Sequence, residues 1–347
     1  MTHKLPLLID SGEWTIGHCQ GIALDKARGH MYFSFTTALI KTDLTGRVLG
    51  SVTGLLGHLG CIAFCQEDGK VYGSLEYKND EIGEGILKNL GSSAKPATGF
   101  YIAVFDTARI DALELDASRD GAMRAAYLKE VYDDYTAPGH RFGCSGIDGL
   151  TFGPKFGAPA DSKKYLTVAY GVYGDTARQD NDHQVLLMYD PDEINATARP
   201  LVQTAMHTSG PERPAEKLFL FTGNTCYGIQ NLEYDPFTQG WLMAVYKGSK
   251  PQYPNYTLFV ADGSIAPTVA PLRGCGTEGA QLALKQIGLK DESSGLRGYH
   301  FPDGSTGLCA LGDGRYYISR HVKAAHGYQS LVRLYQWDEK TPFAPLT

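Results

Sequence analysis

Two histidines stand at the same place in two similar stretches of this sequence. His18 and His58 each lie four residues before an isoleucine, Ile22 and Ile62, in runs that read HCQGIALD and HLGCIAFC. Imidazole titrates near neutral pH and serves as a general base, a general acid or a metal ligand. We expect the two rings to face each other and at least one to take part in catalysis. The alternative is that both only fill space at the centre of the fold.

Cations, tyrosines and further histidines follow the apolar runs of other stretches. Arginine binds a carboxylate through two hydrogen bonds, so several cations together predict an anionic ligand. A tyrosine can stack on a sugar or donate a proton, although most tyrosines in such strands only pack. Beside Tyr77 and Tyr246, the expected substrate contacts are Lys78, His140, Arg141, Tyr170, Tyr173, Tyr227, Asn231, Lys247, Arg320 and His321.

Carboxylates and metals offer alternative chemistry. Glu76, Asp148, Asp175 and Glu233 are available for a two-carboxylate glycosidase mechanism, which needs a pair roughly 5–10 Å apart. We expect no metal or cofactor; the alternatives are a transition metal on His18, His58, His140 and His321, or calcium at Asp148. No GxSxG, HExxH, Walker or strand-linked GxGxxG motif occurs.

A repeat organises these residues. Each unit has an apolar strand, a tight polar turn with Gly or Lys, and a second strand rich in Tyr, Phe and Val. The units span residues 18–35, 58–77, 146–173, 228–248 and 306–321. Third strands are expected at 38–46, 99–107, 183–191, 256–264 and 330–338, and weaker fourth strands at 47–52, 125–132, 217–223 and 266–272. Four antiparallel strands repeating around a ring are typical of a β-propeller.

The sequence also predicts how the ring closes and how many blades it has. The fifth unit ends after its third strand, while the apolar run 5–9 has no partner in the first unit, so we predict that the N-terminal strand completes the last blade. The inner strands give five blades in one all-β domain, residues 1–347. The long intervals around the third unit leave room for more blades, up to seven, or for insertions at 78–98, 111–125 and 174–182. Short helices are expected at 84–91 and 279–288.

One face of the ring carries the chemistry. Loops that enter the innermost strands and loops that join second to third strands open on the same face of a propeller. Here they are long and contain most of the candidate side chains, whereas turns on the other face, such as KARG and QEDG, are short and generic. We therefore predict a ligand site at this mouth.

Composition limits the classes of partner. The net charge is −6 with neutral histidines, 43% of residues are hydrophobic, and no basic block occurs, which argues against nucleic acid. No apolar run is long enough to span a membrane, and the apolar stretch within the first ten residues is too short for the core of a signal peptide. The seven cysteines, an odd number without CxxC spacing, predict free thiols and a cytoplasmic protein.

The opening of the chain resembles a family of propellers. The runs at 18–23, 31–37, 39–46, 57–60 and 71–80, with a weaker echo at 143–152 and 224–235, are similar to L-rhamnose-α-1,4-D-glucuronate lyases and related rhamnosidases. Those relatives are typically secreted and seven-bladed, so this chain departs from them in both respects. The resemblance implies β-elimination at a uronic acid.

Such an elimination assigns three roles. A cation (Arg320, Lys247 or Arg141) neutralises the carboxylate, His18 or His58 removes the C5 proton, and Tyr77 or Tyr246 protonates the leaving oxygen. We therefore expect a lyase acting on a small anionic oligosaccharide. A glycoside hydrolase is the alternative enzyme, and a sugar-binding or protein-docking propeller is the non-catalytic alternative.

Overall fold

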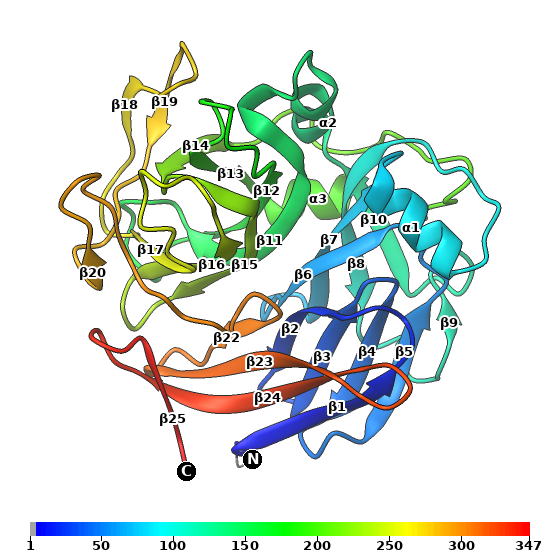
Figure 1. Ribbon diagram of the computed structural model, residues 1–347. Helices are drawn as coiled ribbons and strands as arrows, with labels where there is room; N and C mark the ends of the chain where they lie inside the picture. Colours follow the sequence, from blue (N-terminus) through cyan, green and yellow to red (C-terminus); the bar gives the residue numbers. More distant parts are fainter. Residues whose placement is uncertain (1–4) are drawn as a thin grey trace.

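The innermost strand of each sheet is one of the five apolar stretches found in the sequence. The computed structural model describes residues 5–347, in which these strands, β2, β6, β11, β15 and β22, surround the centre of a ring (Figure 1). Sheets of antiparallel strands extend outward from them. The prediction of an all-β propeller with five blades is confirmed.

Within each blade, the strands follow chain order from the axis outward. They are β2 (Cys19–Asp25), β3 (His30–Phe35), β4 (Ala38–Asp43) and β5 (Val48–Thr53); β6 (His58–Phe64), β7 (Lys70–Tyr77), β8 (Gly99–Asp106) and β10 (Met123–Tyr127); β11 (Cys144–Pro154), β12 (Lys164–Val172), β13 (His183–Tyr189) and β14 (Glu216–Phe221); β15 (Thr225–Asp235), β16 (Gly240–Lys247) and β17 (Leu258–Asp262); β22 (Leu308–Ala310), β23 (Arg315–Lys323) and β24 (Tyr328–Trp337).

The fifth blade is completed by the N-terminal strand. β1 (Leu8–Trp14) runs antiparallel to β24, with Ile9 opposite Val332. The amide of Ser330 also donates a hydrogen bond of 2.8 Å to Oγ of Ser11. The predicted closure of the ring is confirmed, although the strand begins near the end of the expected run 5–9, at Leu8, and continues to Trp14.

Some outer elements differ from the expected pattern. The segment 266–272 supplies β18 (Thr268–Pro271), which pairs with β19 (Glu278–Gln281); β19 lies parallel to β14 and so extends the third blade rather than the fourth. Part of 279–288, expected as a helix, is therefore strand. The outer side of β17 is bridged instead at Leu284 and Tyr299. The remaining strands are β9 (Leu115–Asp116), β20 (Leu289–Lys290), β21 (Arg297–Gly298) and β25 (Phe343–Pro345).

Three short α-helices interrupt the blades. α1 (Glu81–Asn89) overlaps the helix expected at 84–91. In the segment 125–132, expected as a strand, β10 supplies only residues 125–127, and α2 (Lys129–Thr136) takes residues 129–132. α3 (Pro191–Thr197) begins at the cap Asp190. A 3₁₀ turn spans Arg141–Gly143. No helix among residues 5–347 is long and apolar enough to cross a membrane.

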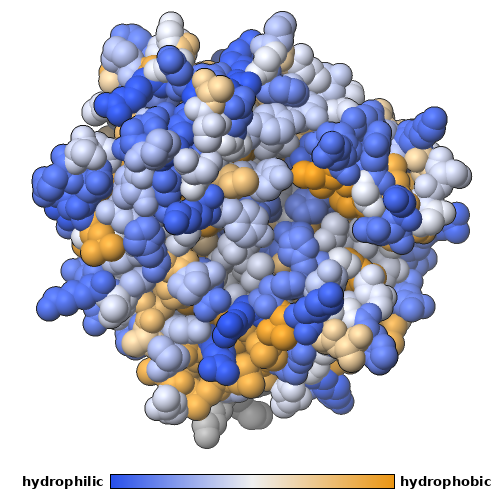
Figure 2. Space-filling view, in the orientation of Figure 1, coloured by the Kyte–Doolittle hydropathy of each residue, from blue (hydrophilic) through white to orange (hydrophobic). Residues whose placement is uncertain are grey.

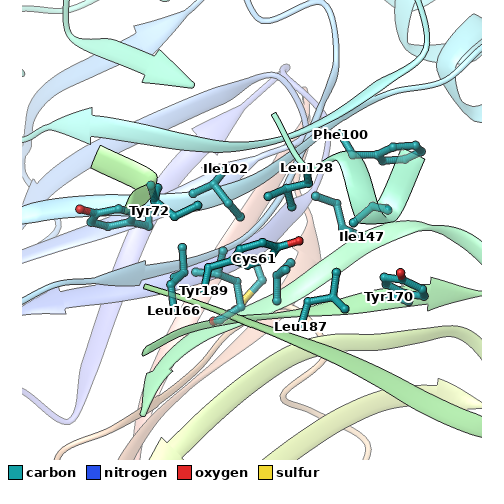
Figure 3. Close-up of a cluster of buried hydrophobic side chains, with 14 of the residues drawn as sticks. Cys61, Tyr72, Phe100, Ile102, Leu128, Ile147, Leu166, Tyr170, Leu187 and Tyr189 are labelled. Atoms are coloured by element: carbon teal, nitrogen blue, oxygen red, sulfur yellow. The ribbon is translucent and has the colours of Figure 1, made fainter. Parts of the chain in front are cut away.

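Packing between neighbouring blades fixes the inner strands. The faces of the second and third blades meet in a cluster that includes Tyr72, Ile102, Leu166 and Leu187, all buried (Figure 3). Alternation along each strand sends every second side chain into such an interface. Burial of apolar surface stabilises the arrangement by about 25 cal/mol per Å². The inner strands therefore form a stiff support for the loops at the mouth.

Irregular pairing near the starts of the inner strands changes the direction in which their first side chains point. The pairing register shifts between Cys19 and Gly21 in β2, and between Leu59 and Ile62 in β6. β11 and β15 contain similar shifts near their starts. A β-bulge bends a strand and changes the direction in which side chains point. Residues beside these bulges consequently face the centre of the ring.

Candidate active site

A cavity of about 600 Å³ opens at the predicted mouth of the ring. Its lining comes from the first four blades, the loop before β2, α1 and the start of β24. The lining residues are Thr15, Ile16, Gly17, His18, Gln20, Thr36, Thr37, His58, Glu76, Lys78, Glu81, Ile82, Gly85, Ile86, Asn89, Leu90, Ser145, Ile147, Asp148, Gly171, Tyr227, Gln230, Tyr246 and Tyr328. Figure 2 shows the hollow near the middle of this face.

Two buried carboxylates line the cavity and have different partners. Oε1 of Glu76 lies 2.7 Å from Nζ of Lys78, and Oε2 accepts a 3.0 Å hydrogen bond from the Ile147 amide. Asp148, on the bulged start of β11, accepts a 3.2 Å hydrogen bond from the Cys61 amide. Lys78 also donates to the carbonyl of Ser145. One carboxylate therefore has a cation beside it, and the other is held by a backbone N–H.

The partners set the protonation of the two acids. Burial raises the pKa of Asp148 well above its usual range, and the nearby charge of Glu76 raises it further. Burial also raises the pKa of Glu76, while Lys78 opposes that rise. Burial lowers the pKa of Lys78, but the carboxylates of Glu76 and Asp80 outweigh that effect and raise it. Burial therefore favours the protonated form of Asp148, whereas Lys78 favours the ionised form of Glu76.

The two histidines both line the cavity, and both are neutral. Burial lowers the pKa of His18 to about 4 and that of His58 to about 3. Nε2 of His18 accepts a 3.0 Å hydrogen bond from the Gln20 amide. Nδ1 of His58 lies 3.7 Å from Oε1 of Glu76 and has no hydrogen-bond partner in the described part of the chain. His58 therefore has a buried ring nitrogen without a hydrogen-bond partner among residues 5–347.

His321 lies next to His18 rather than in the lining itself. The two rings meet edge to face with their centroids 5.4 Å apart, and Tyr328 packs on the other side of His321. Burial lowers the pKa of His321 as well. Among residues 5–347, no group of three His, Cys, Asp or Glu side chains is arranged to hold a metal ion.

Three tyrosines contribute aromatic surface to the cavity: Tyr227, Tyr246 and Tyr328. Burial raises the pKa of Tyr246 to about 12, so its phenol keeps its proton. Tyr227 is 46% exposed and has a left-handed backbone, with φ of 62°. That conformation is uncommon for a residue other than glycine and is frequent at binding sites.

A second, more open hollow of about 470 Å³ adjoins the cavity at Tyr227. His140 and Tyr173 line it, and their rings pack with centroids 5.2 Å apart. Arg178 lies at its edge, where its guanidinium bonds to Asp180. The predicted residues His140, Tyr173 and Tyr227 are therefore brought together with Asp175, and Tyr227 also lines the cavity that contains Glu76 and Asp148.

Several predicted site residues lie outside both hollows. Tyr77 is buried and donates to Oε1 of Gln203, while Tyr170 is buried and donates to Oδ2 of Asp134. Arg141 also bonds to Asp134, at 2.7 Å. Alternation explains the first case, because Glu76 and Tyr77 are neighbours on β7 and point to opposite faces. Lys247 and Arg320 are exposed and line neither hollow.

Asn231 joins the blades at the axis instead of lining the cavity. Its Nδ2 donates to the carbonyls of Gln20 at 2.8 Å and Ser305 at 2.9 Å. Its Oδ1 accepts a 3.4 Å contact from Sγ of Cys61. The side chain is fully buried, and its polar atoms are all used by the protein.

The sequence analysis did not predict that α1 and the side-chain amides of two glutamines would line the cavity. Gln20 and Gln230 both line it, but single glutamines carry no recognisable pattern. The sequence did indicate the helix that forms this wall, because it predicts a short helix inside the insertion 78–98. Nothing in the sequence indicated that this helix would turn its apolar side toward the mouth.

Comparisons with known proteins add little. No family model and no curated protein matches the chain. Among solved structures, a GH43 β-1,3-galactosidase with galactodeoxynojirimycin is 12% identical, with 95% of this chain and 96% of that chain covered and a TM-score of 0.44. The Cps50 (Swd1) β-propeller domain of Myceliophteria thermophila is 9% identical, with 97% and 88% covered and a TM-score of 0.37.

A third neighbour is the holo form of the pyranose dehydrogenase PQQ domain from Coprinopsis cinerea. It is 12% identical, with 90% of this chain and 81% of that chain covered and a TM-score of 0.34. Likenesses of this size carry no argument about activity. The resemblance to rhamnosyl-glucuronate lyases accordingly stays a prediction.

Proposed function

We propose that this protein cleaves a glycosidic bond in a small glycoside bound in the mouth cavity. The observation that carries the proposal is the pair of buried carboxylates, one beside a cation and one without. Burial and the nearby charge of Glu76 raise the pKa of Asp148, which favours its protonated form. The ammonium of Lys78, 2.7 Å from Glu76, opposes the effect of burial and favours the ionised form of that carboxylate. Two acids in different protonation states are what acid–base cleavage of a glycoside requires.

Hydrolysis is the better supported reaction. Asp148 gives its proton to the glycosidic oxygen as the bond to the anomeric carbon breaks. Water adds to that carbon and passes one proton to Glu76, which also stabilises the positive charge that develops on the sugar ring. The tyrosines and the amides of Gln20 and Gln230 supply the stacking surface and hydrogen-bonding groups that a sugar needs.

Elimination is the second candidate, favoured by His58. His58 lines the cavity as a neutral ring, and its buried Nδ1 has no hydrogen-bond partner among the described residues. Tyr246 keeps the proton that a leaving oxygen would take. Two features weigh against it. An imidazole with so low a pKa is a weak base, and the proposed neutralisers Arg141, Lys247 and Arg320 do not line the cavity.

The test compares products and variants. The protein is incubated with glucuronate- and galacturonate-containing oligosaccharides and with neutral aryl glycosides, and both reducing sugar and the ultraviolet absorbance of an unsaturated product are measured. Asp148→Asn is expected to lower hydrolysis by about 10²- to 10⁴-fold. Asp192→Asn, which changes an aspartate whose side chain is 94% exposed, is the matched control and should leave the rate unchanged.

Other outcomes favour the remaining hypotheses. A rise in absorbance that His58→Ala abolishes and Asp148→Asn spares would replace hydrolysis by elimination. Binding without either product would favour a sugar-binding propeller. We also propose that the enzyme works without a metal or cofactor, so activity should survive dialysis against a chelator, and that it acts in the cytoplasm on short glycosides.

A further inference from the structure

One wall of the mouth cavity is apolar and comes from a single helix. Ile82, Ile86 and Leu90 all line the cavity and follow one another at intervals of four residues. Side chains at this spacing lie on one face of a helix. Ile82 and Leu90 remain 41% exposed although they are large and apolar. Figure 2 shows hydrophobic surface beside the hollow, on the side where Figure 1 places α1.

This wall is an addition to the second blade. Residues 78–98, which contain α1, join β7 to β8, whereas Thr36 and Thr37 alone join β3 to β4. The connection between β23 and β24, residues 324–327, is also short and carries no helix. The same connections in the third and fourth blades, residues 173–182 and 248–257, are longer but also contain no helix. α1 is therefore particular to the second blade, at the mouth.

α1 is fixed to the carboxylate pair. The side chain of Asp80 caps the helix by accepting from the amides of Ile82 and Gly83. The same carboxylate lies 3.7 Å from Nζ of Lys78, which contacts Glu76. A Cβ on Gly83 would fall 1.8 Å from the carbonyl oxygen of Lys78, so the helix sits directly on that backbone. The apolar face is consequently held in place beside the reacting groups.

The space in front of the helix is open. A Cβ on Gly85, which lines the cavity between Ile82 and Ile86, would meet nothing within 4 Å. The same cavity is also lined by Glu76, Asp148 and the amides of Gln20 and Gln230. One cavity thus combines a polar side, suited to hydroxyl groups, with an apolar side that offers no partner for them.

We propose that the α1 wall is an aglycone subsite, and that the substrates are glycosides whose leaving group is an aryl or alkyl alcohol rather than a second sugar. The sugar ring then lies against the carboxylates and amides, and the apolar group lies against Ile82, Ile86 and Leu90. That the ligand is a glycoside rests on the proposed function. Binding of an apolar group against α1 does not require that the protein cleave it.

The test uses three probes and calorimetric titration of the full chain. The probes are 4-methylumbelliferyl β-D-glucuronide, methyl β-D-glucuronide and free 4-methylumbelliferone. The umbelliferyl compound is expected to bind at least about ten-fold tighter than the methyl compound, because an apolar contact of this size contributes that much. Ile82→Ser should remove most of the difference. Ile265→Ser, at an isoleucine that is 46% exposed elsewhere on the surface, should keep it.

Ile82 and Leu90 are each 41% exposed, so neither belongs to the buried core. Leu90→Ser serves as a second variant of the same kind, and the thermal midpoint of each variant shows whether it folds. Equal affinity for the two glucuronides would overturn the proposal, as would an umbelliferyl preference that Ile82→Ser leaves intact. Binding of free 4-methylumbelliferone alone, dependent on Ile82, would support the apolar subsite and contradict glycoside cleavage. Absence of binding by all three probes would overturn the subsite.

Discussion

The ammonium of Lys78 and the carboxylate of Glu76 form a contact of 2.7 Å, and both side chains are only 6% exposed. A buried pair of this kind contributes modestly as a pair, but removal of one partner leaves a buried charge uncompensated. The chemistry proposed for Glu76 therefore depends on Lys78. The backbone of Lys78 also supports α1.

Lys78→Met is expected to lower stability and activity together. Loss of the cation leaves Glu76 buried beside Asp148, which favours protonation of Glu76, so hydrolysis at neutral pH should fall by at least about ten-fold. The stability loss is expected to be about 3 kcal/mol, by analogy with other broken buried pairs. Denaturant midpoints and initial rates are the measurements. The double variant Lys78→Met/Glu76→Gln should recover stability but not activity; if it stays as unstable as the single variant, the pair is not the cause.

Gly83→Ala is expected to unseat α1 while Gly85→Ala is not. The added methyl group at Gly83 would overlap the Lys78 carbonyl, whereas the one at Gly85 meets open space. Alanine favours a helix over glycine by roughly 1 kcal/mol, so only the clash can make the first variant worse. Thermal midpoints of the two proteins test this, and a lower midpoint for Gly85→Ala than for Gly83→Ala contradicts it.

Asn231→Leu is expected to loosen the centre of the ring. The change removes both donors to the Gln20 and Ser305 carbonyls, and unpaired buried acceptors cost about 1–3 kcal/mol each. The denaturant midpoint should fall accordingly. Asn79→Leu, at a side chain whose hydrogen bond to Thr98 is exposed, should leave it nearly unchanged. A direct role of Asn231 in substrate binding would instead change affinity without changing the midpoint.

Glu233 should make stability depend on pH. It lies on the opposite side of the ring from the mouth, in a cavity of about 270 Å³, and accepts hydrogen bonds from Ala310 N and the Thr151 hydroxyl. Burial raises its pKa to about 8, well above the unfolded value near 4.3. Because the folded pKa is the higher one, the stabilising contribution is complete below about pH 4 and is lost as pH rises through 8.

Glu233→Gln removes that dependence. Between about pH 4 and 8 the wild-type protein should lose roughly 1.4 kcal/mol per pH unit relative to the variant. Thermal midpoints of both proteins at several pH values give the difference, and Glu193→Gln, at an exposed glutamate, is the control. A difference that does not change with pH would mean that the carboxyl ionises in the folded protein as it does in the unfolded chain.

The repeat made the architecture readable from the sequence. Each inner strand alternates apolar residues behind a tight turn, and both features are local, so the five blades and the closing strand could be predicted. The side-chain directions at the mouth could not. Tyr77 and Glu76 are adjacent in the sequence, and only the register of β7 decides that the carboxylate lines the cavity. Arg141 seemed free because its partner, Asp134, lies on a helix that replaced an expected strand.

The pairing of β1 with β24 sets the order in which the protein can be built. During synthesis β1 emerges before the blades, but its partner follows some 319 residues later, as the spacing of Ser11 and Ser330 indicates. Four blades can form their interfaces in turn while the first strand stays unpaired. Such a distant contact slows folding. Until β24 is made, the chain is an open arc in which the edge of β1 has no partner strand. A chaperone could cover that edge in the meantime.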